Sequence, residues 1–346
     1  MIRLHTLLYF SLFITLFLSA QQQRQIFEFN YQNQTLNGVL DMPKDTIPRG
    51  LVLIMHGSGQ TNAVAQNWYA DIRTTIVNSG YATYMWDKIG CGQSTGTFSY
   101  GQTVYDSASE AIAAINVLKE QKISGSDNIG LYGGSRASWV NPIIINQYKD
   151  IAFWISISGV DGKENFKYLL ENNLRIEGVP KDSISLLTDE WSKATKIQYT
   201  GGSFESAKKA APNLSKNAFI LRFNGGPYKE EAYYKYQETA ITQKLDKVTG
   251  LPIVIENFDT MLMNISCPVL ALFGEKDMHV DWKKTKALYE STLGKATELT
   301  IKSFPEANHN MFKCKTGGFY EFQDNDLTWE RPEGFLQTIS DWLADL

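Results

Sequence analysis

The sequence predicts an α/β fold: a mostly parallel sheet flanked by helices, with a helical lid inserted between two strands. Three observations support this class. Short apolar runs recur along the 346-residue chain, as strands covered on both faces of a sheet require. Amphipathic segments lie between these runs, and alternation of strands with helices is typical of α/β proteins. One long polar stretch interrupts the alternation, which indicates an insertion.

An antiparallel pair of strands opens the predicted fold. Residues 26–29 and 35–40 alternate apolar and polar side chains around Asn33, which favours a turn. The parallel strands are predicted at the six apolar runs, residues 51–55, 81–86, 128–132, 151–157, 269–273 and 299–304. Helices are predicted where apolar residues recur at three- and four-residue spacing, at residues 66–78, 104–119, 282–293 and 334–346.

The insertion is predicted at residues 161–263, a stretch rich in Lys, Glu and Tyr with one candidate strand at 218–223. We expect it to form a lid or cap over a core built from residues 21–160 and 264–346. A peripheral helical decoration is the alternative. Its aromatic residues are expected either to line an acyl or aryl pocket or to pack within the lid: Trp191, Tyr199, Phe204, Tyr228, Tyr233 and Tyr234.

Composition excludes several classes of function. The net charge of −4 lacks the basic excess that nucleic-acid binding requires, so no nucleic-acid partner is expected. Three cysteines, Cys91, Cys267 and Cys314, allow at most one internal disulfide and no disulfide scaffold. With four histidines and no clustered Cys/His pattern, we expect no metal site. Glycine motifs for dinucleotides or nucleotides are absent, and no cofactor is predicted.

The N-terminus has the pattern of an export signal. Arg3 and His5 precede an apolar run at residues 7–18, and Ser19-Ala20-Gln21 offers a cleavage point. Residues 1–20 are therefore predicted to be a signal peptide and the protein to be secreted or periplasmic. Leu18 occupies a position where a small residue is usual. The alternative is a retained anchor, which would be the protein's one contact with a membrane.

A candidate nucleophile lies in residues 129–142, IGLYGGSRASWVNP. Ser135 follows an apolar strand and precedes a helix-compatible segment, with small residues on both sides. A sharp strand-to-helix turn of the G-x-S-x-G type exposes the serine hydroxyl and needs small neighbours. Here Ala137 replaces the last glycine. Because a serine hydroxyl is a weak nucleophile, the prediction also requires a base and donors for the oxyanion.

The base and the acid are expected on loops after later strands. His309 follows the run at 299–304 and is the candidate base, whereas His279 is expected to be a solvated loop residue. Asp277 follows the run at 269–273 and would orient the imidazole, with Glu275 and Asp281 as nearby rivals. Ser135, Asp277 and His309 then occur in the chain order Ser…Asp…His.

The oxyanion donors are predicted to be two backbone amides. Arg136 follows the nucleophile at the start of a helix, so its amide would point into the site. The second donor is expected from the glycine-rich loop M-H-G-S-G-Q after the run at 51–55, where the amide of Ser58 is the candidate. A glycine-rich turn without this role is the alternative.

With these motifs, the sequence resembles the α/β-hydrolase superfamily, and within it exported bacterial hydrolases related to the serine-aminopeptidase and dienelactone-hydrolase groups. The matching segments are residues 54–59, 86–94, 130–142, 265–280 and 304–312. The insertion has no match. Ala137-Ser138 and Arg136 depart from the usual pattern around the nucleophile. The resemblance implies that residues 87–94 form a structural turn beside the site, with Asp87 not catalytic.

The predicted function is a serine hydrolase that cleaves a carboxylic ester or related acyl bond of a small-molecule acyl substrate through an acyl-enzyme. An aminopeptidase-like amide hydrolase and an acyltransferase are alternatives, because both use the same triad. A non-catalytic binding protein on the same fold is disfavoured, since all three triad positions carry competent residue types.

Overall fold

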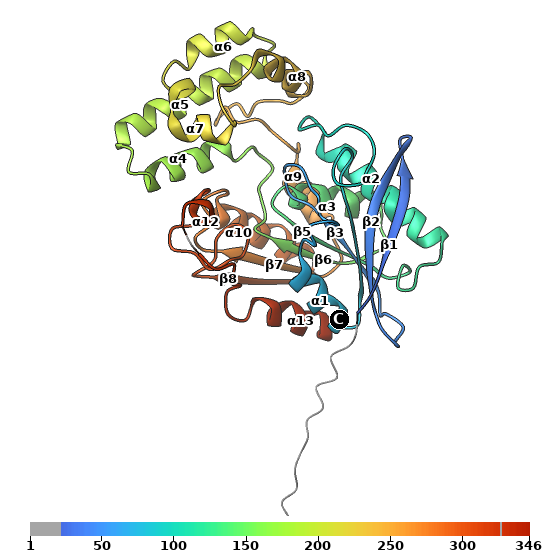
Figure 1. Cartoon of the computed structure of the whole chain (residues 1–346). Helices are drawn as coiled ribbons and strands as arrows, with labels where there is room; N and C mark the ends of the chain where they lie inside the picture. Colours follow the sequence, from blue (N-terminus) through green and yellow to red (C-terminus); the bar gives the residue numbers. More distant parts are fainter. Residues whose placement is uncertain (1–21, 326) are drawn as a thin grey trace, which may run out of the picture.

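A computed structural model describes residues 22–325 and 327–346, so the predicted signal at residues 1–20 lies outside the described part of the chain. Its centre is an eight-stranded sheet of order β1-β2-β4-β3-β5-β6-β7-β8 (Figure 1). β1 (Gln22–Tyr31) and β2 (Gln34–Pro43) form the antiparallel pair, and β2 joins β4 antiparallel. The remaining pairs are parallel. Their strands are β3 (Leu51–Met55), β4 (Ala82–Trp86), β5 (Ile129–Gly134), β6 (Ile151–Ile157), β7 (Val269–Gly274) and β8 (Leu299–Phe304).

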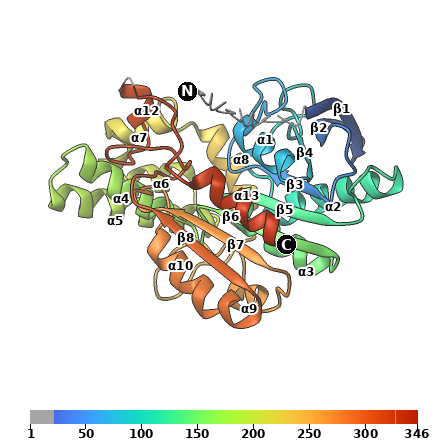
Figure 2. The same ribbon diagram turned by 90° about the horizontal axis from the view of Figure 1, so that it is seen from below.

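Strands β3 to β7 are buried on both faces, which explains their apolar runs, whereas β8 lies at the edge of the sheet and is partly exposed. In β3, Leu51 and Leu53 face one core while Val52 and Ile54 face the other, as the two-residue period of a strand dictates. Four helices cover the first face: α2 (Val104–Glu120), α3 (Ala137–Gln147), α9 (Phe258–Met263) and α10 (Trp282–Ser291). The second face is covered by α1 (Ala70–Asn78) and α13 (Phe335–Asp345), seen from below in Figure 2.

The predicted fold class is therefore confirmed, and each predicted strand of the parallel sheet is present. Two helix boundaries differ. The helix expected from residue 66 begins at Ala70, after Tyr69 in left-handed backbone conformation. The helix expected at 282–293 is divided at Thr292 into α10 and the short α11 (Leu293–Ala296).

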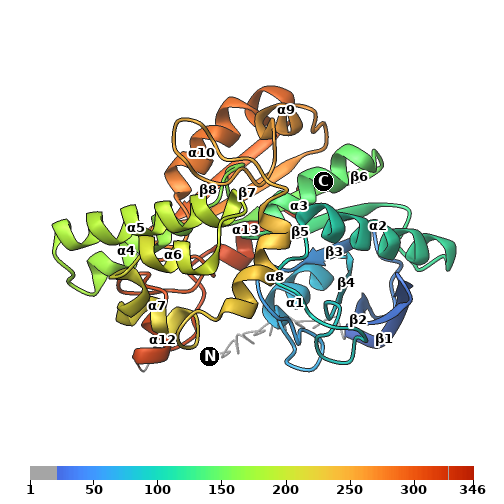
Figure 3. The same cartoon turned by 90° about the horizontal axis from the view of Figure 1, so that it is seen from above.

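The insertion forms a helical layer of its own (Figures 1 and 3). It contains α4 (Phe166–Ile176), α5 (Lys181–Tyr199), α6 (Phe204–Ala210), α7 (Ala218–Phe223) and α8 (Glu230–Ala240). Leu170, Leu174 and Phe219 belong to a hydrophobic cluster separate from the two cores of the sheet. The helix α9, which the predicted range 161–263 included, instead packs Phe258 and Leu262 on the main core.

The candidate strand at 218–223 was wrong, because this segment is α7. The Asn217 side chain accepts a hydrogen bond from the Ile220 backbone N–H at 3.2 Å and so caps a helix. Phe219 and Ile220 are buried in the cluster of the insertion. An apolar run of this length does not by itself distinguish a strand from a short buried helix.

Two further findings concern the described residues taken together. Within residues 22–325 and 327–346, no helix is long and apolar enough to cross a membrane. Over the same residues, Cys91, Cys267 and Cys314 are free thiols, so none of them forms a disulfide.

Candidate active site

Ser135 lies on the turn between β5 and α3, at the carboxyl end of a central strand. Its backbone φ is +55°, a left-handed conformation that costs a non-glycine residue about 1–3 kcal/mol. A Cβ atom on Gly133 would lie 2.6 Å from the Ala137 Cβ, so the turn closes only because residue 133 is glycine. This packing also accommodates alanine at position 137, where the nucleophile motif usually has glycine. The sharp turn predicted around Ser135 is thus present.

Asp277 and His309 are in direct contact. The His309 Nδ1 lies 2.7 Å from Asp277 Oδ2, and both side chains are buried. Asp277 Oδ1 accepts hydrogen bonds from the backbone N–H groups of His279 at 2.8 Å and Val280 at 3.0 Å. Both carboxylate oxygens are therefore held, and the acid can orient the ring through Nδ1.

The two loops that carry this pair are joined through the backbone. The Lys276 N–H donates to the Ala307 carbonyl at 3.0 Å. A Cβ on Gly274 would lie 2.4 Å from the Asn308 carbonyl oxygen, so the glycine at the end of β7 permits this approach. The rival acids are occupied elsewhere: Glu275 accepts from the Ser303 hydroxyl, and Asp281 caps α10.

The segment after β6 connects Ser135 with His309. The Ser135 N–H donates to the Ile157 carbonyl at 3.1 Å, and the next residue, Ser158, donates its hydroxyl to the His309 carbonyl at 2.6 Å. Among the described residues, no hydrogen bond joins the Ser135 hydroxyl to the His309 ring. Catalytic hydrogen bonds frequently form only in the substrate complex, so the contact between Ser135 and His309 stays a prediction.

The glycine-rich loop lies beside the nucleophile. A Cβ on Gly57 would lie 3.7 Å from the Ser135 Cβ. Within the described chain, the backbone N–H groups of Ser58 and Arg136 have no hydrogen-bond partner. The Arg136 guanidinium points away to Gln102 and Ser107, at 2.7 and 3.0 Å, and burial lowers its pKa to about 10. Both predicted donors therefore have a backbone N–H without a partner among the described residues, one in the loop beside Ser135 and one in the residue that follows it.

Two residues beside the site have roles that sequence reasoning missed. His279, expected to be solvated, is half-buried, with its ring 4.6 Å from the His309 ring and 4.9 Å from that of Phe319. Burial lowers its pKa to about 3, so it is neutral. Lys88 donates to the Gly57 and Gly59 carbonyls. Its place in the segment 87–94 was the available signal, because that segment was expected to form a turn beside the site.

Asp87 has the structural role that the resemblance implies. Its carboxylate is fully buried and accepts hydrogen bonds from the Val64 N–H at 3.0 Å and the Asn37 side chain at 3.2 Å. A Cβ on Gly92 would meet the same carboxylate, so the turn wraps closely around it.

The insertion contacts the core on two sides of the site. The Tyr168 hydroxyl of α4 donates to the Asp277 carbonyl at 3.2 Å, and the Asn173 side chain donates to the Met278 carbonyl at 3.2 Å. At the other side, the Thr239 hydroxyl of α8 donates to the Gly101 carbonyl at 3.1 Å. Most of its aromatic residues pack on one another, as Phe204 and Tyr228 do on Tyr233.

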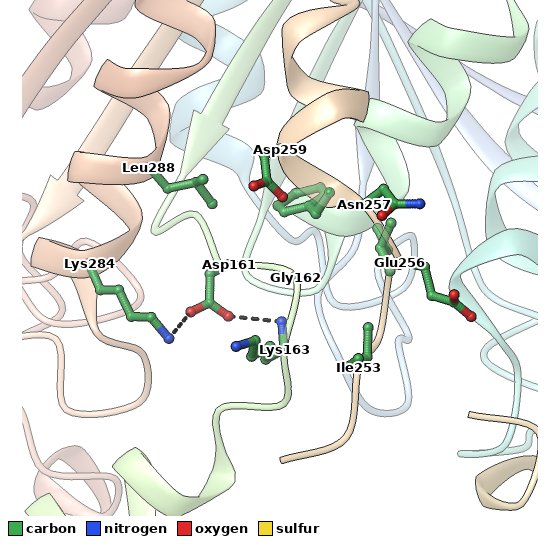
Figure 4. Close-up of a pocket in the computed structure, with 11 residues that line it drawn as sticks. Asp161, Gly162, Lys163, Ile253, Glu256, Asn257, Asp259, Lys284 and Leu288 are labelled. Atoms are coloured by element: carbon green, nitrogen blue, oxygen red, sulfur yellow. Dashed lines mark hydrogen bonds and ion pairs between the residues drawn. The ribbon is translucent and has the colours of Figure 1, made fainter. Parts of the chain in front are cut away.

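A cavity of about 330 Å³ lies where the insertion leaves the core and returns to it (Figure 4). Its wall includes Asp161, which pairs with Lys284 and accepts a hydrogen bond from the Lys163 N–H at 2.9 Å. Neither Ser135 nor His309 lines it. The cavity therefore belongs to the root of the insertion rather than to the candidate site.

Comparison with known proteins gives family matches over two parts of the chain. Residues 46–154 match the family model described as serine aminopeptidase, S33, and residues 256–340 match that of the dienelactone hydrolase family. No curated protein sequence is similar enough to count as a match.

Solved structures share the fold across nearly the whole chain. An esterase from Pyrococcus furiosus has a TM-score of 0.54 at 16% identity, covering 93% of this chain and 91% of its own. Est1E from Butyrivibrio proteoclasticus, solved with ferulic acid, has a TM-score of 0.53 at 16% identity, covering 92% and 96%. Proline iminopeptidase from Mycobacterium smegmatis has a TM-score of 0.53 at 15% identity, covering 93% and 98%.

The sheet, the strand order and these matches define a hydrolase of the α/β-hydrolase superfamily. Within that superfamily, the two matching models are those of the serine-aminopeptidase and dienelactone-hydrolase families, the groups that the sequence resembles.

Proposed function

We propose that the protein is a serine hydrolase that cleaves a carboxylic ester through an acyl-enzyme intermediate. The Asp277–His309 contact at 2.7 Å carries this proposal, together with Ser135 on a strained turn of the same sheet. The names of the esterase neighbours agree with ester chemistry. We further propose export from the cytoplasm, which rests on the sequence of residues 1–20.

The proposed reaction has two half-reactions. The Ser135 hydroxyl oxygen attacks the ester carbonyl carbon while its proton passes to His309 Nε2. The resulting oxyanion accepts hydrogen bonds from the amides of Ser58 and Arg136, and its collapse expels the alcohol, which takes the proton from His309. A water molecule then attacks the acyl-enzyme in the same way and releases the acid with free Ser135.

Amide hydrolysis is the second candidate, because one matching family and one structural neighbour are peptidases by name. An acyltransferase would use the same triad but pass the acyl group to an alcohol or amine in place of water. Measuring transfer to an added alcohol separates that activity from hydrolysis.

The first prediction concerns the nucleophile. We expect hydrolysis within a panel of p-nitrophenyl esters of graded chain length and aminoacyl anilides, and a loss of at least about 10³-fold in kcat for Ser135→Ala. A fluorophosphonate should label the wild type at Ser135, located by mass spectrometry of the peptide. Ser138→Ala, a nearby serine buried in α3, is the matched control. Full activity in Ser135→Ala, or labelling elsewhere, would overturn the assignment.

A further inference from the structure

Lys88 lies directly after β4 with its ammonium buried against the glycine-rich loop. Its Nζ donates to the Gly57 carbonyl at 2.6 Å and to the Gly59 carbonyl at 2.8 Å, and the residue is only 8% exposed. Burying an ammonium group is costly unless it is hydrogen-bonded. The structure uses this costly group to hold two carbonyls of the loop beside Ser135.

Fixing these carbonyls also fixes the direction of an amide. In a trans peptide the C=O and the following N–H point in opposite directions, and the described chain has no cis peptide. Because the Gly57 carbonyl points to Lys88, the Ser58 N–H points away from Lys88. That N–H has no partner among the described residues. The position of a Cβ on Gly57, 3.7 Å from the Ser135 Cβ, places this peptide beside the nucleophile.

We propose that Lys88 is a positioning residue that preorganises the oxyanion hole by holding the Gly57–Ser58 peptide with its N–H turned toward the nucleophile. The inference rests on the proposed serine-hydrolase function. Preorganised donors avoid the cost of reorienting during the reaction. Loss of the hydrogen bonds from Lys88 to the loop therefore weakens transition-state binding more than substrate binding.

The surroundings of Lys88 make its hydrogen bonds to the Gly57 and Gly59 carbonyls sensitive to pH. Burial, and then the nearby Arg136, lower the pKa of Lys88 to about 8, whereas Cys91 and Glu110 act in the opposite direction. His56 also faces this region, but burial and Lys88 lower its pKa to about 3, so it stays neutral across the relevant range. Lys88 is protonated below about pH 8 and loses its charge above it, which weakens its hydrogen bonds.

The experiment measures kcat and KM separately on the best ester of the panel, for wild type, Lys88→Met and Lys88→Arg. We expect Lys88→Met to lose about 10–100-fold in kcat, less than removal of a donor itself costs, with KM changed less than about threefold. Phosphonylation of Ser135 should slow in parallel, because that reaction also needs the oxyanion hole. Lys302→Met is the control, since Lys302 is exposed on the edge strand β8 and donates to Thr338 of α13.

The pH profile supplies a readout that a purely structural role would not move. Wild-type kcat should fall at least about threefold between pH 7.5 and 9.5, and Lys88→Arg, which keeps its charge, should lack this fall. If Lys88→Met does not fold, the comparison of the alkaline fall in wild type and Lys88→Arg tests the proposal on its own. An unchanged kcat in folded Lys88→Met, or equal alkaline falls in wild type and Lys88→Arg, would overturn the proposal. If Ser135→Ala instead hydrolyses the ester as fast as the wild type, the hydrolase function itself is refuted.

Discussion

At the scale of single residues, the tautomer of His309 depends on how Asp277 is held. Asp277 Oδ1 accepts two backbone N–H groups, and Oδ2 faces His309 Nδ1. Nδ1 therefore carries the proton, which leaves Nε2 free to accept the proton of a nucleophile. The burial of both side chains keeps water from competing for this hydrogen bond.

Asp277→Asn should invert this tautomer. The two backbone donors require an oxygen at the Oδ1 position, so the amide nitrogen would face His309 and donate to Nδ1. The imidazole would then carry its proton on Nε2 and could not act as a base. We expect kcat to fall by about 10²–10⁴-fold with intact folding, measured by ester hydrolysis and circular dichroism.

Asp281→Asn is the matched control for that change. Asp281 follows Asp277 by four residues and caps α10 through the Lys284 N–H at 3.1 Å. We expect less than about threefold change in kcat and little change in stability, because the Asn oxygen caps a helix about as well as that of Asp. A larger loss of kcat in Asp281→Asn than in Asp277→Asn would contradict the assignment of the acid.

Single residues also show where sequence reasoning succeeds and where it fails. Asp277 and His309 were identifiable because each follows a recognisable strand, and carboxyl ends of parallel strands meet at one edge of a sheet. The roles of His279 and Lys88 were missed, because neither the packing of one ring on another nor the choice of backbone carbonyls as partners has a sequence pattern. His279 packs on His309 and Phe319, and Lys88 binds residues 57 and 59.

At the scale of elements, the turn between β5 and α3 depends on close packing around Gly133. A Cβ at this position would lie 2.6 Å from the Ala137 Cβ and 2.8 Å from the Asn141 amide nitrogen. Contacts this short force the strand and the helix apart. The left-handed conformation of Ser135 holds only while the two elements remain in place.

Gly133→Ala should therefore lower both stability and activity. We expect a loss of about 1–3 kcal/mol in the free energy of unfolding, measured by urea denaturation, and a loss of kcat as Ser135 shifts. Adding Ala137→Gly should restore part of both, because it removes the shortest contact. If Gly133→Ala alone were as stable and active as the wild type, the turn would not be closed by this packing.

The central parallel strands were predictable because both of their faces are buried, so they are mostly apolar. The same signal misled within the insertion, where the apolar segment 218–223 forms α7. Its six residues bury one face against other helices of the insertion, and a run so short does not reveal its period.

At the scale of the whole molecule, the two ends of the insertion are joined to each other at its root, and the insertion also contacts the core. Lys163 and Ile253 form an antiparallel bridge, and the Glu164 N–H donates to the Pro252 carbonyl at 2.9 Å. The Arg222 guanidinium adds a bidentate pair with Asp324, at 2.8 Å for each contact. The pair of Arg222 with Asp324 and the hydrogen bonds of Tyr168 and Asn173 to the loop of Asp277 attach the helical layer to the core.

Glu164 makes the root of the insertion dependent on pH. Burial raises the pKa of its carboxyl to about 7, although the Phe166 N–H donates to it at 2.7 Å. A raised pKa means that the folded protein favours the protonated acid. The resulting stabilisation is fully present below the ordinary pKa of the carboxyl and is lost as pH rises through about 7.

Glu164→Gln should remove this dependence, because glutamine is neutral at every pH and its oxygen can still accept from Phe166. The free energy of unfolding of the variant relative to wild type should therefore rise between pH 5 and pH 8, by about 1–3 kcal/mol, as urea midpoints would show. Glu171→Gln, an exposed change on α4, is the control and should show no such rise. A difference between Glu164→Gln and wild type that stays constant over this range would mean that the root carries no buried titrating carboxyl.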